Sequence, residues 1–297
     1  MRQLFRATIL WALLAQFCAQ TPARGEELHI NTPDGARTAI VLPAQRARAP
    51  TVIVLHGALI SAEYTARWYG FVEVARRYGF ATAFPRGISM QWNDGRDAWM
   101  SGIDDVAFLR GVARELVSRG ISDPARLYLI GISSGGMMTF RMLCEASDLF
   151  VGAGAIIASM PASVGANCRP KRAVPVIMFN GTADPLVPYR GGGVGFGGWQ
   201  GNVWSAESTA AFLARGNGCG PPSKALVGSS SATNTIRIAR LDWLRCSSER
   251  GVTLYRIEGG GHQVFGHTNF FPWFLGPGTR QVSAPGTIMA AFAGMQP

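Results

Sequence analysis

The chain has 297 residues, of which 47% are hydrophobic, and its 28 Lys and Arg against 18 Asp and Glu give a formal net charge of +10. This length fits one large domain or two small ones. No block of basic residues alternates with aromatic residues, so nucleic-acid binding is not expected. Arginines scattered over a solvated surface explain the charge most simply, and attraction to an acidic polymer or cell envelope is the alternative.

The N-terminal segment has the layout of a secretory signal peptide. Arg2 and Arg6 precede a largely apolar run, residues 7–17, which ends near small residues. The run is too short, and too interrupted by Gln16, to span a membrane. We therefore predict a signal peptide over residues 1–24, a secreted or periplasmic location, and no stable membrane span after signal removal. The alternative is an uncleaved, non-secretory N-terminus.

After the signal, strand-like and helix-like segments alternate along the chain. A hairpin is expected around residues 33–35, and the β-branched and apolar run at residues 51–55 is typical of a central parallel strand. Asp104 and Asp105 are suited to begin a helix. The alternation predicts an α/β fold with a mainly parallel sheet covered by helices on both faces. The other predicted elements are strands at residues 27–31, 36–42, 80–84, 126–131, 153–158, 174–179 and 252–257, and helices at residues 70–78 and 137–144.

Two stretches interrupt this alternation. Residues 190–202 contain seven glycines together with Phe196 and Trp199, which predicts a mobile loop, either a lid over the site or a disordered excursion. Residues 221–235 are rich in Pro, Ser and Thr. Neither stretch is typical of an interdomain linker, and no internal repeat is found, so residues 25–297 are predicted to form a single domain.

A turn rich in glycine and serine, residues 131–136, separates a predicted strand from a predicted helix. The pattern G-x-S-x-G at such a junction is typical of the nucleophile elbow of α/β-hydrolases, where a strained turn holds a serine toward the substrate. The glycine spacing identifies the serine. Ser133 has a glycine two residues before it and another two residues after it, whereas Ser134 would need a glycine at Ile132.

A serine nucleophile needs a base, and the base must follow the serine in the chain if the fold is that of α/β-hydrolases. Of the four histidines, only His262 and His267 follow Ser133. We favour His262 because three glycines connect it to a predicted strand and let its ring reach the serine. His267 lies beside an aromatic run and is expected to be structural.

The acid that orients the base should lie between the serine and the histidine. Asp184 is the best candidate because it follows the strand predicted at residues 174–179. Asp148 comes too early, at the end of the elbow helix, and Asp242 belongs to the stretch after the glycine-rich loop. The alternative role for Asp184 is that of a simple turn residue before proline.

The oxyanion of a tetrahedral intermediate needs two N–H donors. We predict the main-chain N–H of Ser134 and that of Ala58, with Leu59 as the alternative to Ala58, and expect His56 to order this loop by hydrogen bonding. No cluster of His, Cys or acidic residues has metal-ligand spacing. The glycines at residues 191–193 lack the strand-then-helix setting of a phosphate loop, so neither metal nor cofactor is predicted.

Four cysteines remain once the signal with Cys18 is removed, an even number that suits an oxidising compartment. Four cysteines allow three pairings. We favour pairing between neighbours, Cys144 with Cys168 and Cys219 with Cys246, because each closes a short loop that would stabilise the fold by about 3 kcal/mol. The alternative is four buried thiols.

Several motifs together resemble the polyhydroxybutyrate depolymerase/feruloyl esterase group of α/β-hydrolases, and in particular its secreted LpqC-like esterases. The resemblance extends from about residue 36 to residue 266 and implies a serine esterase with Ser133, Asp184 and His262 as its triad. It also supports the Cys219–Cys246 pairing. The matching segments are residues 55–57, 92–93, 104–109, 131–138, 181–189, 217–219 and 258–262.

The chain departs from the family pattern at two places near the expected site. Ala58 stands where many depolymerases have cysteine, and Val264 and Phe265 replace the usual Trp-Pro. These differences leave the triad intact. They make a soluble ester, an oligomeric hydroxyalkanoate, or a feruloyl or acetyl ester of the plant cell wall at least as plausible as a solid polyester.

The sequence therefore predicts a secreted serine carboxylesterase acting on an ester substrate, without predicting its oligomeric state. A serine peptidase of the same fold is one alternative, and a catalytically silent hydrolase fold that binds envelope or carbohydrate is another. Up to two of five aromatic residues are expected to line the substrate pocket; these are Trp92, Trp99, Trp199, Trp204 and Phe265.

Overall fold

The computed structural model describes residues 25–96, 102–228, 236–247, 250–267, 269 and 271–295. The predicted signal peptide, residues 1–24, lies outside the described residues. The strands of the main sheet are β1 (Glu26–Thr32), β2 (Gly35–Leu42), β3 (Ala49–Leu55), β4 (Ala81–Pro85), β5 (Ser122–Ile132), β6 (Gly152–Ile156), β7 (Val176–Gly181), β10 (Ser223–Gly228), β11 (Arg237–Trp243) and β12 (Val252–Glu258). The α-helices are α2 (Ala62–Trp68), α3 (Phe71–Tyr78), α4 (Asp105–Ser118), α5 (Ser134–Glu145), α6 (Ala162–Asn167), α7 (Ala206–Gly216), α8 (Pro272–Leu275) and α9 (Ala284–Gly294).

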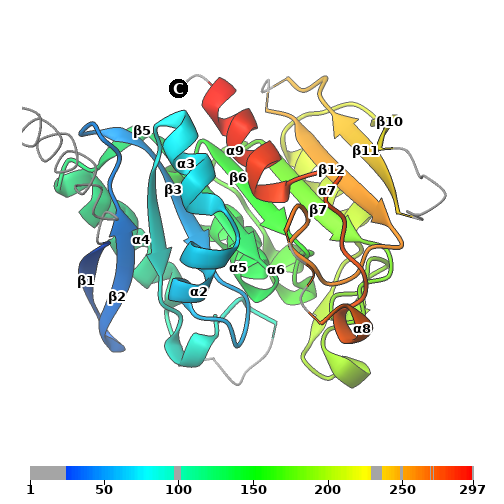
Figure 1. Ribbon diagram of the computed structural model, residues 1–297, viewed down its shortest axis with the longest axis horizontal. Helices are drawn as coiled ribbons and strands as arrows, with labels where there is room; N and C mark the ends of the chain where they lie inside the picture. The colour runs from blue at the N-terminus through cyan, green and yellow to red at the C-terminus, as the bar shows by residue number, and fades with distance from the viewer. Residues whose placement is uncertain are drawn as a thin grey trace, which may run out of the picture.

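Within the described residues, one ten-stranded sheet runs through the molecule in the order β1-β2-β4-β3-β5-β6-β7-β12-β11-β10 (Figure 1). The six neighbouring strands β4, β3, β5, β6, β7 and β12 are parallel to one another. Strands β1 and β2 at one edge of the sheet and β11 and β10 at the other pair antiparallel. The prediction of a mainly parallel sheet is confirmed. β3, β4, β6 and β7 are buried along their whole length, as expected of strands covered on both faces.

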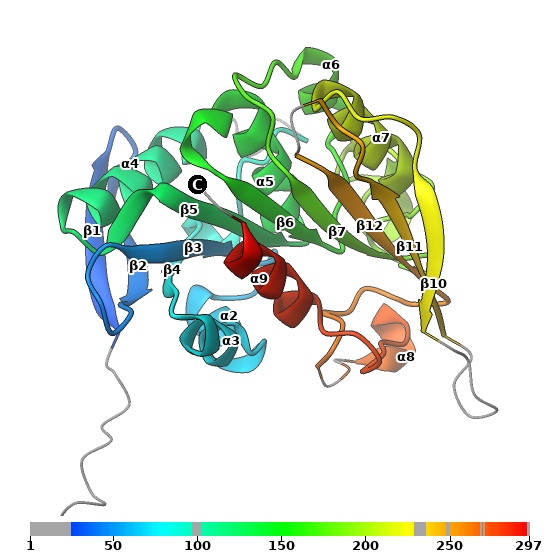
Figure 2. The ribbon, with the colours of Figure 1, turned by 90° about the horizontal axis from the view of Figure 1, so that it is seen from above.

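Helices cover both faces of the sheet (Figure 2). Helices α4, α5, α6 and α7 lie on one face, and α2, α3 and α9 lie on the other. Side chains of α3 and α9, such as Phe71 and Phe292, pack with strand residues in one apolar cluster. Helix α4 begins as predicted, because the side chain of Asp104 accepts a hydrogen bond from the N–H of Ala107 and so caps the first turn.

The two stretches that interrupt the predicted alternation both contain short strands. Within the Pro-, Ser- and Thr-rich stretch at residues 221–235, residues 223–228 form β10, which pairs with β11 at the sheet edge; its sequence, SKALVG, lacks the long apolar run that marks a central strand. The glycine-rich loop is not a disordered excursion. Its short strands β8 (Gly192–Gly193) and β9 (Asn202–Val203) pair antiparallel around a turn of 3₁₀ helix at Phe196–Gly198.

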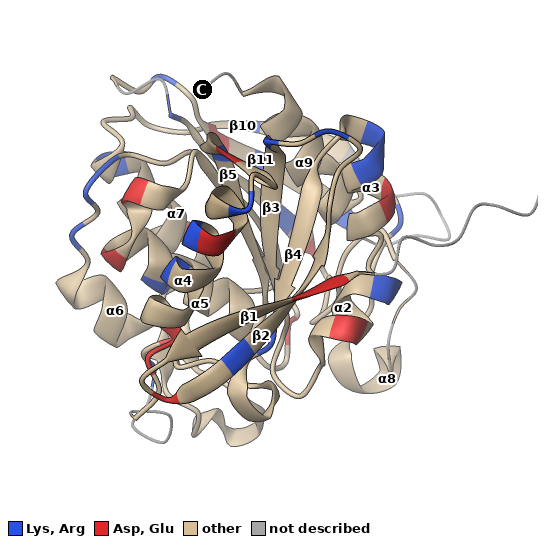
Figure 3. Ribbon diagram, turned by 90° about the vertical axis from the view of Figure 1, so that its left-hand side faces the viewer, with Lys and Arg blue, Asp and Glu red and all other residues tan. Residues whose placement is uncertain are grey.

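Charged residues of both signs are interspersed over the helices and edge strands seen in Figure 3. Arg86, for example, bridges Glu27 of β1 and Glu63 of α2. No helix within the described ranges combines the length and apolar character needed to cross a lipid bilayer.

Candidate active site

Ser133 lies in the tight turn between β5 and α5. Its φ of 53° and ψ of −119° put a non-glycine residue in a sparsely populated, strained region of backbone space. A Cβ on Gly131 would lie 2.0 Å from the carbonyl oxygen of Gly135, and a Cβ on Gly135 would lie 2.4 Å from that of His56. Only glycine fits at these two positions, which agrees with the spacing argument for Ser133.

His262 brings the serine and Asp184 together. The loop after β12 places His262 Nε2 3.1 Å from Ser133 Oγ, and His262 Nδ1 lies 2.7 Å from Asp184 Oδ2. The loop after β7 holds Asp184, whose Oδ1 accepts hydrogen bonds from the N–H groups of Leu186 and Val187, both at 2.8 Å. Both side chains are largely buried. The arrangement allows the imidazole to accept the serine proton while the carboxylate fixes its tautomer.

The alternative acids and base lie elsewhere. Asp242 is part of β11, where it accepts hydrogen bonds from Arg240 and Thr253, and Asp148 pairs with Arg110 and Lys171 on the surface. His267 packs edge-on against Tyr69, and burial lowers the pKa of its imidazole.

The two residues predicted to supply the oxyanion donors, Ala58 and Ser134, both line the cavity beside Ser133. Ser134 is the first residue of α5, and the first N–H groups of a helix have no intrahelical acceptor and carry the positive end of its dipole. The alternative donor Leu59 is already engaged, since its N–H donates to the carbonyl oxygen of Met90 at 3.0 Å. Ala58 and Leu59 both border the pocket beside Ser133 and Ser134, so the engaged N–H of Leu59 is what favours Ala58 as the second donor.

His56 and Trp92 hold the loop that carries Ala58. Gly87 N–H donates to His56 Nε2 at 2.9 Å, so the proton of the neutral ring is on Nδ1, which donates to the carbonyl oxygen of Gly57 at 2.8 Å. Burial lowers the pKa of His56 and favours this neutral form. The indole N–H of Trp92 donates to the carbonyl oxygen of His56 at 2.9 Å.

Trp92→Phe is expected to lower kcat severalfold, and at most about tenfold, because it removes one buried hydrogen bond that positions the loop carrying Ala58, the predicted oxyanion donor. KM for a nitrophenyl ester should change little, since Trp92 does not border the pocket. Initial-rate kinetics on nitrophenyl acetate measure both constants. Trp199→Phe, at a 74% exposed position, is the control, and an unchanged kcat in Trp92→Phe contradicts this role.

The buried His56 should also make the fold sensitive to acid. Because its pKa is lowered in the folded state, the unfolded chain binds more protons below the unperturbed pKa of about 6.5. The free energy of unfolding should therefore fall as the pH drops below that value, by up to about 1.4 kcal/mol per pH unit. Denaturant titrations of the wild type and His56→Gln between neutral and mildly acidic pH measure this, and the prediction fails if both lose stability equally.

A cavity of about 380 Å³ opens above Ser133 and His262. It belongs to the size class of small-molecule sites. Its walls come from the loops after β3, β4, β6, β7 and β12, from the elbow and from the glycine-rich loop. The large apolar side chains that line it are Leu59, Ile60, Tyr69, Ile132, Ile157, Leu186, Val187, Val194, Phe196, Val264 and Leu275.

The prediction of aromatic pocket residues is wrong for Trp92, Trp199 and Phe265. Trp92 and Phe265 are buried in the interior, at 2% and 0% exposure, and Trp199 points to solvent. Trp204 packs against Phe212 instead, and Trp99 lies outside the described residues. Residue type alone could not have identified the lining, because most of it is aliphatic and comes from separate segments, and its aromatic members are Tyr69 and Phe196.

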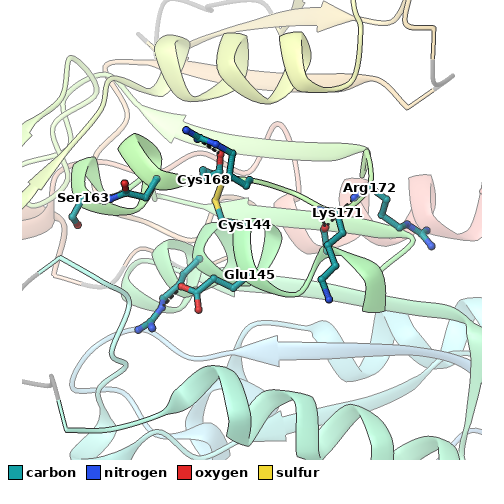
Figure 4. The surroundings of a disulfide bond; sticks show 10 residues. Cys144, Glu145, Ser163, Cys168, Lys171 and Arg172 are labelled. Atoms are coloured by element: carbon teal, nitrogen blue, oxygen red, sulfur yellow. Dashed lines mark hydrogen bonds and ion pairs between the residues drawn. A yellow bond between two sulfur atoms is a disulfide. The ribbon is translucent and has the colours of Figure 1, made fainter.

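Both favoured disulfides are present in the structure. Cys144 at the end of α5 bonds to Cys168 after α6, and Cys219 after α7 bonds to Cys246 after β11. Figure 4 shows the first bond, which ties α5 to the segment carrying Lys171. Among the described residues, no group of three or more His, Cys, Asp or Glu side chains is placed to hold a metal ion.

The sequence of the chain is similar to those of known esterases. No family model matches the chain. The putative esterase NocK of Nocardia uniformis subsp. tsuyamanensis is 30% identical over 259 residues, which cover 83% of this chain and 75% of NocK. Feruloyl esterase B of Piromyces equi is 28% identical over 222 residues, which cover 72% of this chain but 39% of that protein.

A solved structure supports the fold. The acetyl xylan esterase from Aspergillus awamori superposes with a TM-score of 0.57 at 13% identity, over 81% of this chain and 95% of that one. The sheet order and the elbow agree with the α/β-hydrolase fold. The chain thus belongs, with NocK, to the feruloyl esterase-like family of carboxylic ester hydrolases.

Proposed function

We propose that the chain is an exported serine carboxylesterase whose single catalytic domain uses Ser133, His262 and Asp184. The observation that carries this proposal is the continuous hydrogen-bond chain from Ser133 Oγ through both nitrogens of His262 to Asp184 Oδ2, at 3.1 and 2.7 Å. This chain lies at the floor of a largely apolar cavity. No metal or cofactor takes part in the chemistry we propose.

The reaction has two halves. Ser133 Oγ attacks the ester carbonyl carbon as its proton passes to His262 Nε2, and the N–H groups of Ser134 and Ala58 hold the resulting oxyanion. The imidazolium then returns the proton to the alcohol oxygen as the C–O bond breaks, leaving an acyl-enzyme. Water, deprotonated by His262, hydrolyses that ester and restores the serine.

The substrate class follows from the cavity and the relatives. An apolar cavity of this size suits an acyl or aromatic group carried on an alcohol, and feruloyl, acetyl and hydroxyalkanoate esters are the candidates. Two disulfides support a secreted or periplasmic location, because such bonds persist in oxidising compartments.

The test combines labelling with a substrate panel. A fluorophosphonate should label the purified protein at Ser133, as located by peptide mass spectrometry. The panel consists of short- and long-chain nitrophenyl esters, methyl ferulate, acetylated xylan, polyhydroxybutyrate film and an aminoacyl-nitroanilide. Ester hydrolysis without nitroanilide hydrolysis supports an esterase, the reverse indicates a peptidase, and absence of labelling would refute a serine enzyme.

A further inference from the structure

Arg96 links two loops that are distant in sequence at the edge of the substrate cavity. Its guanidinium Nε lies 3.0 Å from each carboxylate oxygen of Asp94, and Nη2 lies 2.8 Å from Oδ2. On its other side, Nη1 donates to the main-chain oxygen of Gln200 at 3.2 Å. The side chain of Arg96 is 11% exposed and that of Asp94 3%. A planar guanidinium that binds a carboxylate in this way has little freedom to turn.

The loop that carries Asp94 is itself firmly held. Asn93 donates its N–H to Asp105 Oδ2 at 2.6 Å, and its carbonyl oxygen accepts a hydrogen bond from Arg141 of α5 at 2.7 Å. Ser163 of α6 donates to the carbonyl oxygen of Gly95. Arg96 therefore projects from a segment anchored to three helices, α4, α5 and α6.

The other partner of Arg96 belongs to the glycine-rich loop, residues 190–202, which supplies one wall of the cavity. Val194, Phe196 and Gln200 of this loop all line the cavity. Most of its glycines have positive φ angles, and such backbone has much conformational freedom to lose when it is ordered. Within the loop, the β8–β9 ladder holds only two residues on each strand. Contacts from outside are needed to fix the wall.

The loop is partly fixed by main-chain and core contacts, since Gly195 N–H donates to the carbonyl oxygen of Leu186 at 2.8 Å and Val194 is buried in an apolar cluster. Two further contacts come from side chains outside the loop. One is the hydrogen bond from Arg96 to Gln200. The other is the packing of Phe196 against Phe274 of α8, with ring centroids 4.5 Å apart. The aromatic contact is half exposed, with Phe196 at 47% and Phe274 at 46%, whereas the Arg96 contact is nearly buried and is charge-assisted. The Arg96 contact is therefore the stronger of the two.

We propose that Arg96 is a positioning residue that clamps the glycine-rich loop against the cavity and thereby sets the preference of the enzyme for larger ester substrates. This inference rests on the proposed esterase function. Buried Asp94 holds the guanidinium in place, and the guanidinium in turn holds the main chain at Gln200. The wall that includes Val194 and Phe196 is thereby kept in position. Arg96 has no hydrogen bond to Ser133, His262 or Asp184 among the described contacts.

Kinetics on two substrates test the effect on selectivity. In Arg96→Gln, the ratio of kcat/KM for nitrophenyl octanoate to that for nitrophenyl acetate should fall about tenfold, the size expected for one lost charge-assisted hydrogen bond. The loss should appear mainly in the KM for octanoate, because the wall contacts the longer acyl group. Arg96→Lys keeps the charge beside Asp94 but has a single donor nitrogen, which cannot pair with Asp94 and reach Gln200 in the way the guanidinium fork does, so its ratio should lie close to that of Arg96→Gln. A ratio that is unchanged or rises overturns the proposal.

Limited trypsin digestion tests the clamp without relying on catalysis. Arg190 is exposed at the start of the loop, so nicking after it reports how often the loop opens. Arg96→Gln should raise the nicking rate about tenfold. Arg240→Gln is the matched control, because Arg240 in β11 likewise pairs through Nε with an aspartate two residues away, Asp242. An unchanged nicking rate in folded Arg96→Gln overturns the clamp. Failure of the esterase proposal would instead appear as a wild type without ester hydrolysis.

Discussion

Ser133→Ala is expected to lower kcat for ester hydrolysis by about a millionfold, the loss typical of removing a triad nucleophile. The remaining rate would come from substrate binding and the oxyanion donors, which the substitution leaves in place. Alanine keeps the backbone of the elbow, so the fold should be unaffected. Initial rates of nitrophenyl acetate hydrolysis, followed over long incubations for the variant, measure the loss of kcat.

The neighbouring serine offers a matched control for this variant. Ser134→Ala removes a hydroxyl of the same elbow but keeps the main-chain N–H that we assign to the oxyanion, so its kcat should stay within a few fold of the wild type. Covalent labelling by a fluorophosphonate should persist in Ser134→Ala and disappear in Ser133→Ala. If Ser133→Ala kept near-wild-type turnover, the assignment of the nucleophile would be wrong.

The elbow could be predicted because its geometry depends on residues close in sequence. A Cβ at Gly131 or Gly135 would collide with the main chain of the turn or of the adjoining strand, so the glycine spacing alone fixes which serine lies at the corner. Chain order then left few choices for the acid and the base, because only His262 and His267 follow Ser133. Local steric rules and a short list of titratable residues were sufficient.

The substrate cavity could not be predicted in the same way. Its lining comes from many separate segments of the chain, and aliphatic residues such as Leu186 and Val194 have no pattern that distinguishes a cavity wall from a core. Aromatic residues misled the prediction because their size suits several roles. Trp92 became a buried hydrogen-bond donor to the oxyanion loop, and Trp199 became an exposed loop residue. Tertiary contacts, rather than residue type, decide these roles.

The clamp at Arg96 was missed for a related reason. Arg96 and Gln200 are 104 positions apart, and the acceptor is a main-chain oxygen, which no side-chain pattern reveals. The two-residue spacing from Asp94 is equally uninformative, since Arg240 and Asp242 have the same spacing in β11. What distinguishes Arg96 is that a buried carboxylate and a cavity wall lie on opposite sides of one guanidinium.

Asp184→Asn should lower kcat by about ten-thousandfold, through the tautomer of His262. Asp184 Oδ1 accepts the N–H groups of Leu186 and Val187, so an asparagine will keep its carbonyl oxygen there and turn its NH₂ toward His262 Nδ1. Facing a donor, Nδ1 must present its lone pair, which moves the ring proton to Nε2. In that tautomer His262 cannot accept the proton of Ser133.

This prediction separates the orienting role of Asp184 from a general effect of removing a buried carboxylate. Asp242→Asn is the comparison, because Asp242 is also buried, at 6% exposure, and is hydrogen-bonded to neighbouring side chains, but it lies in β11, away from Ser133 and His262. It should lose stability and keep its kcat, whereas Asp184→Asn should keep its fold and lose its kcat. The two hydrogen bonds that hold Oδ1 make this outcome specific, since they dictate which end of the amide meets the histidine. A loss of less than about tenfold in Asp184→Asn would mean that His262 does not depend on Asp184 for its tautomer.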